Sequence, residues 1–446
     1  VEIQILGDTH GNLVHCYERE CSIQRRHQKI IEEAPSPAVT DAIRASMGDA
    51  AIAAAKKLGY SSAGTVEFLL SGDEFYFLEV NARLQVEHPI TEEIIGKDLV
   101  REQIRVAEGE TLSFTQEELS INGHAIEARL YAEDPAKGFL PAPGPVLAWT
   151  PSKVGQARFD SGVETGSEIS TQFDPMIAKV IVHAPTRREA AGRLARVLET
   201  TEIQGLRTNR DFLVATLRTG EFLAGDTTTD FIERVEPTRM REVTREELVE
   251  AAIAVAMEGQ AQRRNQAKVL RSLPSGWRNS TMPMEQFSFR CGDDDIDVAY
   301  RLHRDGRFRL LCDEQEHLIE AYECGAGTVD MDHNGRRLQF TVQAHGSDWL
   351  VHSAAGDLVL KEQARFPDSS LDANTGGLTA PMPGSVLATE VAAGASVTKG
   401  DLLLIMEAMK MEHRITAPRD GVIETVHVTI GDQVDNGQLL VSMAEE

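Results

Sequence analysis

Two glutamates in one short stretch of the chain are spaced to face each other across a β-hairpin. Residues 65–81 read TVEFLLSGDEFYFLEVN, and a turn centred on Asp73 pairs Glu67 with Glu79. Like charges at cross-strand distance destabilise a hairpin, and a divalent cation between them removes that penalty. Carboxylate oxygens of this kind suit Mg²⁺ or Mn²⁺. Two solvated glutamates on an outer sheet face have the same spacing, so the residues alone leave both interpretations open.

The same turn sets the rest of the hairpin register. It pairs Thr65 with Asn81 and Leu69 with Phe77. Because side chains alternate along a strand, the other face of this hairpin is expected to be an apolar core face. Its residues are Val66, Phe68, Leu70, Tyr76, Leu78 and Val80.

A second candidate for chemistry is Lys410, which lies between the two copies of an internal repeat. Thr379-Ala380-Pro381 recurs as Thr416-Ala417-Pro418, and the same offset of 37 residues relates several later valines, glycines and leucines. The repeat predicts a two-fold pseudo-symmetric β structure whose halves share one core. Lys410 is then expected to project from a turn at the crossover, where a modifying enzyme can reach it. A solvated surface lysine is the alternative, but two exposed methionines beside it favour a functional role.

The elements that position these residues fall into five expected segments. Mixed strands and helices fill residues 1–117 and 118–235, including a helix over residues 41–59. Residues 236–370 begin with a helix that the Thr244–Glu247 capping box opens and that ends near Arg264. Short alternating strands follow it and predict a small antiparallel barrel packed with this helix. The polar stretch PDSSLDANTGG predicts a linker, assigned to residues 371–378, before the all-β segment 379–446.

Composition excludes several classes of protein. The net charge of −25 argues against binding to nucleic acid or to anionic membranes. Five scattered cysteines without CxxC spacing suit a reducing compartment and exclude a cysteine zinc site. No apolar run approaches the roughly 20 residues that a membrane helix needs.

The segment Ala408-Met409-Lys410-Met411, within a duplicated fold, resembles the biotinyl domain of biotin carboxyl carrier proteins. This resemblance implies that biotin is attached to Lys410. Lipoyl domains have a similar duplicated fold, but their lysine usually follows Asp rather than Met.

The stretch EFYFLEVNARLQVEHPITE is similar to the ATP-grasp signature of biotin carboxylases. The resemblance implies that three residues hold the metal ions on ATP: Glu67, Glu79 and Asn81. It implies a bicarbonate site lined by Arg83, Gln85 and Val86, with Arg83 counted among the catalytic residues. Glu87 is expected to act as the general base.

Two further stretches carry the same resemblance. In CSIQRRHQK, it implies that Gln24 and His27 approach the nucleotide and that Lys29 approaches bicarbonate, although a basic surface turn is the ordinary interpretation of such a run. In HAIEAR, it implies that Arg129 stabilises the enolate of biotin, paired with Glu87.

The order of segments resembles the alpha subunits of acyl-CoA carboxylases of the propionyl-CoA and 3-methylcrotonyl-CoA type. The expected fold is multidomain α+β: the C-terminal half of an ATP-grasp biotin carboxylase, a helix-plus-antiparallel-β-barrel domain that docks a partner, and a duplicated all-β biotinyl (barrel-sandwich) domain. The expected function is ATP-dependent carboxylation of biotin with bicarbonate. Biotin, ATP, Mg²⁺ or Mn²⁺ and bicarbonate are the implied cofactors and substrates.

A pyruvate carboxylase would need a transferase barrel within residues 236–370, which are too few for one.

The resemblance also implies partners and a location. A carboxyltransferase (beta) subunit in a hetero-oligomer would receive the carboxyl group, and a biotin protein ligase would modify Lys410. We expect the bacterial cytoplasm, or the mitochondrial matrix if the source is eukaryotic. The family's amino-terminal nucleotide-fold domain, Gly-rich loop and ATP-contacting lysines do not precede Val1, so we expect a part of a longer subunit that accepts biotin but does not cleave ATP unaided. Two alternatives stay open: a carrier with an inert ATP-grasp remnant, and a non-biotin ligase with a lipoyl-like tail.

Overall fold

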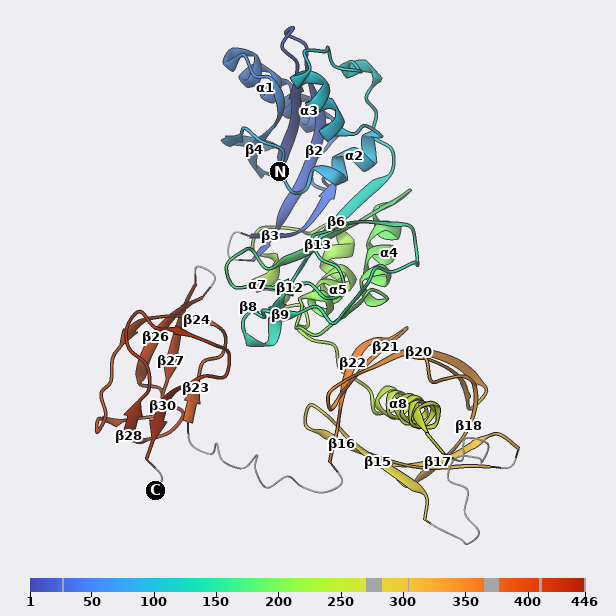
Figure 1. The fold of residues 1–446 in the computed structure, drawn as a ribbon. Coiled ribbons are helices and arrows are strands. Elements are labelled where there is room, and N and C mark those ends of the chain that lie inside the picture. The colour runs from blue at the N-terminus through green and yellow to red at the C-terminus, as the bar shows by residue number, and fades with distance from the viewer. Residues whose placement is uncertain (26–27, 270–282, 304, 365–376, 409–410, 445–446) are drawn as a thin grey trace.

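The computed structural model describes residues 1–25, 28–269, 283–303, 305–364, 377–408 and 411–444. These residues form an eight-stranded sheet with helices, a closed eight-stranded barrel and a pair of four-stranded sheets (Figure 1). Among them, no helix is both long and apolar enough to cross a membrane.

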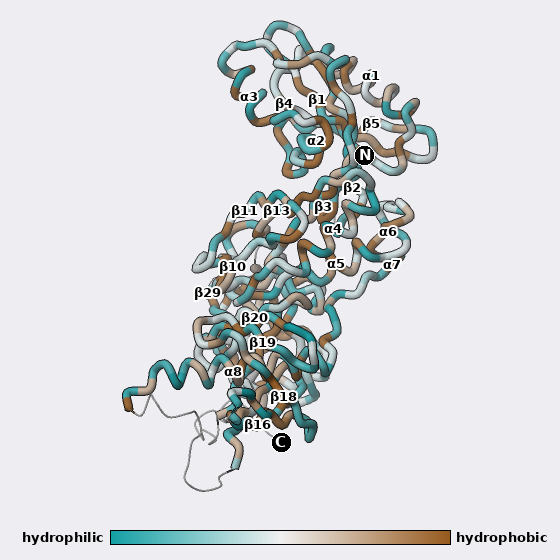
Figure 2. Tube along the Cα trace, turned by 90° about the vertical axis from the view of Figure 1, so that its right-hand side faces the viewer, coloured by the Kyte–Doolittle hydropathy of each residue, from teal (hydrophilic) through white to brown (hydrophobic). Residues whose placement is uncertain are grey.

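The first body is built on one sheet that runs through both N-terminal segments. Its strand order is β11-β13-β6-β3-β2-β1-β4-β5. The bounds are β1 (Glu2–Gly7), β2 (Leu13–Arg25), β3 (Gln28–Ala34), β4 (Ser62–Ser71), β5 (Glu74–Asn81), β6 (His124–Tyr131), β11 (Ala157–Ser161) and β13 (Met176–Ala184). The long hairpin β2–β3 links the upper part of the sheet to the lower part (Figure 2). Strands β1 and β2 form an antiparallel hairpin.

Helices cover both parts of this sheet. Those of the upper part are α1 (Asp41–Leu58), α2 (His88–Ile95) and α3 (Leu99–Ala107), and those of the lower part are α4 (Arg187–Glu199), α5 (Arg210–Arg218), α6 (Gly220–Ala224) and α7 (Phe231–Val235). The predicted helix over residues 41–59 is confirmed. Thr40 caps its first turn, and Gly59 ends it in the left-handed conformation that glycine adopts without strain. Helix α2 packs on β2, β3, β6 and β13.

Short elements complete the first body. They are β7 (Glu133–Asp134), β8 (Leu140–Pro141), β9 (Gly144–Pro145), β10 (Ala148–Thr150), β12 (Glu168–Ile169), β14 (Glu202–Gln204) and the 3-10 turns η1 (Gln116–Glu118) and η2 (Pro135–Lys137).

The barrel encloses a helix. Strands β15 (Glu285–Cys291), β16 (Asp294–Leu302), β17 (Phe308–Cys312), β18 (Gln315–Glu323), β19 (Thr328–His333), β20 (Arg336–His345), β21 (Asp348–Ser353) and β22 (Gly356–Glu362) close around α8 (Arg245–Gln266) (Figure 1). The predicted capping box at Thr244 and Glu247 is present. Helix α8 is buried from Leu248 to Ala261, and its many alanines let the surrounding strands approach closely. The sequence predicted the helix and the barrel, but not that one lies inside the other.

The C-terminal sheets follow the 37-residue repeat. The first copy contains β23 (Gly377–Thr379), β24 (Gly384–Thr389), β25 (Ser396–Val397) and β26 (Leu402–Ala408), and the second contains β27 (Met411–Thr416), β28 (Gly421–Val426), β29 (Gln433–Val434) and β30 (Leu439–Met443). The glycines of each copy adopt positive φ at matching places, such as Gly394 and Gly431. One shared core joins the two halves, which confirms the predicted pseudo-symmetry. The expected linker lies mostly outside the described residues.

The register of the β4–β5 hairpin differs from the predicted register between the two glutamates and the turn. Thr65 pairs with Asn81 and Glu67 with Glu79, as expected. The pairing of Leu69 with Phe77 is wrong, because Leu78 forms a β-bulge and Leu69 pairs with Tyr76 instead. A bulge reverses the faces of the residues beyond it. Tyr76 and Leu78, expected in the core, are therefore exposed, at 52% and 55%. The rings of Phe75 and Phe77 contact Phe68, but Phe77 is still 58% exposed.

Candidate active site

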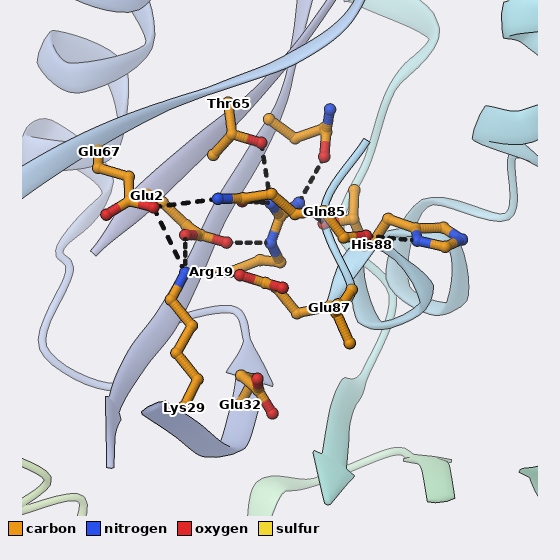
Figure 3. A network of polar contacts seen from close by, with 12 residues as sticks. Glu2, Arg19, Lys29, Glu32, Thr65, Glu67, Gln85, Glu87 and His88 are labelled. Carbon is orange, nitrogen blue, oxygen red and sulfur yellow. Dashed lines mark hydrogen bonds and ion pairs between the residues drawn. The ribbon is translucent and has the colours of Figure 1, made fainter. Parts of the chain in front are cut away.

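The candidate site is a buried polar network on β1–β4 and on the loop that precedes α2 (Figure 3). At its centre lies Arg19, whose side chain is completely buried. The five N–H groups of its guanidinium all donate to side-chain oxygens. The acceptors are Glu2 at 2.6 Å, Gln4 at 2.6 Å, Gln85 at 2.8 Å, Thr91 at 3.1 Å and Thr65 at 3.2 Å. A buried cation with every donor satisfied is rigid, so Arg19 fixes the strands and the loop relative to one another.

Lys29 joins three carboxylates from different elements. Its Nζ lies 2.6 Å from Glu2, 2.6 Å from Glu87 and 3.5 Å from Glu67. Burial alone lowers the pKa of Lys29, but the nearby Cys21, Glu2 and Glu87 together raise it above its ordinary value. Burial alone raises the pKa of Glu2, and Arg19 and Lys29 outweigh it and lower that pKa to about 2. Both groups are therefore charged at neutral pH.

Glu87 lies between two cations. One carboxylate oxygen accepts from Lys29 at 2.6 Å and the other from Arg129 Nη2 at 3.0 Å. Arg129 also pairs with the buried Glu32 at 2.5 Å. Burial lowers the pKa of Arg129, but Glu32 and Glu87 raise it above its ordinary value. The pairing of Glu87 with Arg129, expected from the sequence, is thus present as a contact.

The facing glutamates of β4 and β5 share an amide between them. Asn81 Nδ2 donates to Glu67 Oε1 at 3.0 Å and to Glu79 Oε1 at 3.1 Å, and Gln85 donates to the same Glu67 oxygen at 3.0 Å. Two carboxylates and an amide oxygen are hard donors that suit Mg²⁺, so these residues fit the expected metal ion.

A second acidic cluster does not suit a metal. Glu2, Cys21 and Glu87 place three ligand atoms within 4.8 Å of one another. Burial and the charge of Glu2 raise the pKa of the Cys21 thiol well above its usual range, so it stays protonated. Arg19, Lys29 and Arg129 already pair with these two carboxylates, so no uncompensated negative charge is left for a cation to neutralise.

Four known family descriptions match the chain in succession. Residues 1–115 match the ATP-binding domain of the carbamoyl-phosphate synthase L chain, and residues 127–234 match the biotin carboxylase C-terminal domain. Residues 245–365 match the BT domain of the methylcrotonyl-CoA carboxylase alpha subunit, and residues 377–443 match the biotin-requiring enzyme domain.

Curated relatives match over nearly the whole chain. The methylcrotonoyl-CoA carboxylase subunit alpha of Mus musculus is 38% identical over 463 residues, which cover 100% of this chain and 64% of the relative. The propionyl-CoA carboxylase alpha chain of Ruegeria pomeroyi is 38% identical over 474 residues, which cover 97% of this chain and 68% of the relative. This chain belongs to the alpha subunits of biotin-dependent acyl-CoA carboxylases. It spans about two thirds of the length of these relatives.

Two solved biotin carboxylase structures are similar to about half of this chain. The biotin carboxylase domain of a thermophilic 2-oxoglutarate carboxylase, bound to bicarbonate, is 43% identical with a TM-score of 0.52, covering 53% of each chain. The biotin carboxylase subunit of pyruvate carboxylase is 42% identical with a TM-score of 0.53, covering 54% of each chain. A non-biotin ligase with a lipoyl-like tail does not fit this family.

The predicted site residues of this alpha-subunit chain fall into two groups. Those that lie in one network are Lys29, Glu67, Glu79, Asn81, Gln85, Glu87 and Arg129. The carbonyl of Val86 borders the network and accepts from Lys179 at 2.8 Å. Arg83 is exposed and, within the part of the chain that the structure describes, donates only to the carbonyl of Leu84, at 3.4 Å.

Three further predictions concern residues outside or beside the network. Gln24 lies at the end of β2 and donates to the carbonyl of Cys21 at 2.9 Å. His27 and Lys410 lie outside the described residues. Ala408 pairs with Met411 across the β26–β27 hairpin, and these two described residues flank Lys410 in the sequence.

Sequence analysis missed four charged residues of the site: Glu2, Arg19, Glu32 and Lys179. The sequence pattern could have indicated Glu2. Glu2 and Gln4 alternate with apolar residues on β1, and in the sheet they lie opposite Glu67 and Thr65 of β4. Arg19, Glu32 and Lys179 carry no such signal, because their partners come from distant parts of the chain.

Proposed function

We propose that this chain, as part of a longer subunit, carries residues that carboxylate biotin on Lys410 with bicarbonate and ATP, and that the carboxyl group then passes to a carboxyltransferase subunit. The observation that supports this function best is the position of Glu87 between Lys29 and Arg129. A carboxylate in this position can take a proton from a bound anion while two cations hold that anion.

The acidic and the basic residues of the site have different proposed roles. Glu67, Glu79 and Asn81 would hold Mg²⁺, which lowers the negative charge of ATP phosphates. Lys29 and Gln85 hold bicarbonate, and Glu87 removes its proton so that its oxygen can attack the terminal phosphate of ATP. Biotin, when bound to Lys410, supplies the nitrogen that accepts the carboxyl group. Arg129 stabilises negative charge on an oxygen placed beside it, because its guanidinium is buried and always protonated.

A labelling experiment tests this function. The complete subunit is co-expressed with a biotin protein ligase and incubated with ATP, Mg²⁺ and ¹⁴C-bicarbonate. We expect one biotin on Lys410 by mass spectrometry, ¹⁴C on that biotin, and no label in Lys410→Arg. A carrier with an inert ATP-grasp remnant would accept biotin, but it would show no bicarbonate-dependent release of phosphate.

We further propose that residues 236–370 dock the transferase. Leu311 on β17 and Leu318 on β18 lie diagonally across this strand pair on the outer barrel surface, 42% and 44% exposed. Tyr322 extends the same apolar surface. Exposed apolar side chains at the centre of an interface commonly carry much of the binding energy.

A substitution on this surface tests the docking. Leu311→Asp with Leu318→Asp is expected to abolish co-purification of the transferase and to leave biotinylation intact. Leu223→Asp, a similarly exposed leucine on α6, is the matched control and should retain the partner. Retention of the partner by the double variant would show that another surface binds the transferase.

A further inference from the structure

Two buried glutamates near Arg129 have no role in the proposed function. Glu32 on β3 and Glu127 on β6 are directly opposite each other in the antiparallel ladder, and both are completely buried. Residues opposite each other in such a ladder have Cβ atoms about 4.5–5.5 Å apart. Glu32 lies apart from the Arg19 cluster (Figure 3). Its charged partner is Arg129, at 2.5 Å.

The charges around this pair leave one acid without a cation. Lys29 bonds to Glu2 and Glu87, and Arg129 bonds to Glu87 and Glu32. Lys179 on β13 bonds instead to the Val86 carbonyl at 2.8 Å and to Asp160 at 3.2 Å. Among the described residues, the carboxylate oxygens of Glu32 and Glu127 have no hydrogen-bond partner; Glu32 has its ion pair with Arg129, and Glu127 has no ion pair.

A buried carboxylate without a cation takes up a proton, because keeping it ionised costs several kcal/mol. Burial first, and then Glu32 and Glu87, raise the pKa of Glu127 well above its usual range, and Lys179 and Arg129 oppose them only in part. Burial also raises the pKa of Glu32 to about 7, although Arg129 lowers it. The pair therefore carries at least one proton at neutral pH, and Glu127 is its more basic member.

Arg129 needs a partner that stays charged after the first half of the reaction, so that its side chain keeps its position. If Glu87 takes a proton from bicarbonate, it loses the charge that attracts Arg129. The guanidinium would then be free to move just when it must stabilise charge on the second substrate. Glu32 pairs with the same guanidinium nitrogen as Glu87 but is not the proposed base.

We propose that Glu32 is the positioning residue that holds Arg129 while Glu87 is protonated, and that Glu127, as a neutral acid, donates its proton to Glu32 and holds it in place. This inference rests on the proposed function. Glu32 acts only through Arg129, so its loss affects carboxyl transfer to biotin and spares ATP cleavage.

The first test compares Glu32→Gln with wild type in the complete subunit. Phosphate release reports ATP cleavage, and ¹⁴C on biotin reports transfer. We expect ATP cleavage within about threefold of wild type, and a decrease of at least about tenfold in carboxyl groups transferred per ATP. Glu33→Gln is the matched control, because Glu33 is also buried on β3 but bonds to His124 and Arg187 on the other side of the sheet. Equal transfer ratios for the two variants would overturn the role of Glu32.

The second test does not depend on a folded variant at position 32. In wild type, the transfer ratio is expected to fall as the pH is lowered through about 7, because protonated Glu32 no longer anchors Arg129. A ratio that is constant between pH 6 and pH 8.5 would overturn the proposal. A wild-type subunit without bicarbonate-dependent ATP cleavage would instead contradict the proposed function itself.

The third test detects the proton directly. A protonated carboxylic acid has an infrared C=O band that shifts on deuteration, and Glu127→Gln should remove one such band at pH 8. The same variant should keep the wild-type transfer ratio within about twofold, because glutamine is also a neutral donor. If no band is lost, Glu127 is ionised and does not donate to Glu32.

Discussion

The carboxylase sheet and the barrel are both antiparallel, yet their buried charged residues have different partners. The sheet has Arg19, Glu32 and Glu127 completely buried beside the site. The barrel also buries a completely hidden carboxylate, Glu258 of α8, but backbone N–H groups of Gly325 and Gly327 donate to it, at 2.6 and 2.9 Å. Ion pairs of the barrel such as Arg290–Asp295 lie in solvent.

This contrast indicates why the sheet retains its charges. A buried ion pair is often no more stabilising than well-packed apolar residues of similar volume. It does, however, give fixed charges in surroundings of low dielectric constant, where they act strongly on a substrate. The buried network is therefore better explained by chemistry than by stability. The following predictions test this difference between the two regions.

The largest change in stability is expected from a substitution of Arg19 at the centre of the buried network. Arg19→Met should destabilise the first body by about 3–5 kcal/mol, because Glu2 would be left as a buried charge with one cation fewer. Arg290→Met in the barrel should leave the unfolding transition unchanged, since both members of that pair are exposed. Urea unfolding followed by circular dichroism measures both. Equal losses of stability in the two variants would mean that the sheet and the barrel do not differ in this respect.

The second effect is on catalysis. In the complete subunit, Glu87→Gln should lower bicarbonate-dependent ATP cleavage by about 10²-fold or more, as expected for the loss of a general base. Glu316→Gln, an exposed barrel glutamate paired with Arg309, serves as the control and should retain full activity. Phosphate release measures both variants, and near-normal activity of Glu87→Gln would assign the proton transfer elsewhere.

The third effect depends on pH. Glu127 has a raised pKa when folded, so between pH 4.5 and that value the native state binds one proton more than the unfolded state. Its contribution to stability is thus complete at low pH and is lost as the pH rises, by up to about 1.4 kcal/mol per pH unit.

Glu127→Gln removes this dependence. Its melting temperature relative to wild type should therefore increase steadily between pH 5 and pH 9 in calorimetry. A constant difference would mean that Glu127 is charged when folded. His317→Gln in the barrel, where burial lowers the pKa of the histidine, offers a comparison outside the sheet.

The smallest effect is in the apolar barrel. Ile319→Val should cost about 0.5–1.5 kcal/mol through the loss of one buried methylene group. ATP cleavage by the complete subunit should not change, because Ile319 lies in the barrel core and not in the sheet. A loss of activity would show that the barrel and the carboxylase site are coupled.

Local patterns were enough to predict the parts of the site that lie on one hairpin. The pairing of Glu67 with Glu79, and of Thr65 with Asn81, follows from a single turn. The bulge at Leu78 was not predictable in this way, because it depends on how the hairpin packs against the rest of the sheet.

The sequence by itself determined the repeat around Lys410, the capping box of α8 and the alternation of polar residues along the strands. Each of these is set by neighbours a few residues apart or by a fixed offset. Only the tertiary structure decided that Arg19 meets Thr65 and Thr91, that Glu32 lies opposite Glu127, and that α8 lies inside the barrel. The physical reason is that a buried charge is tolerable only beside its partners, and the sheet order, not the order of the chain, brings those partners together.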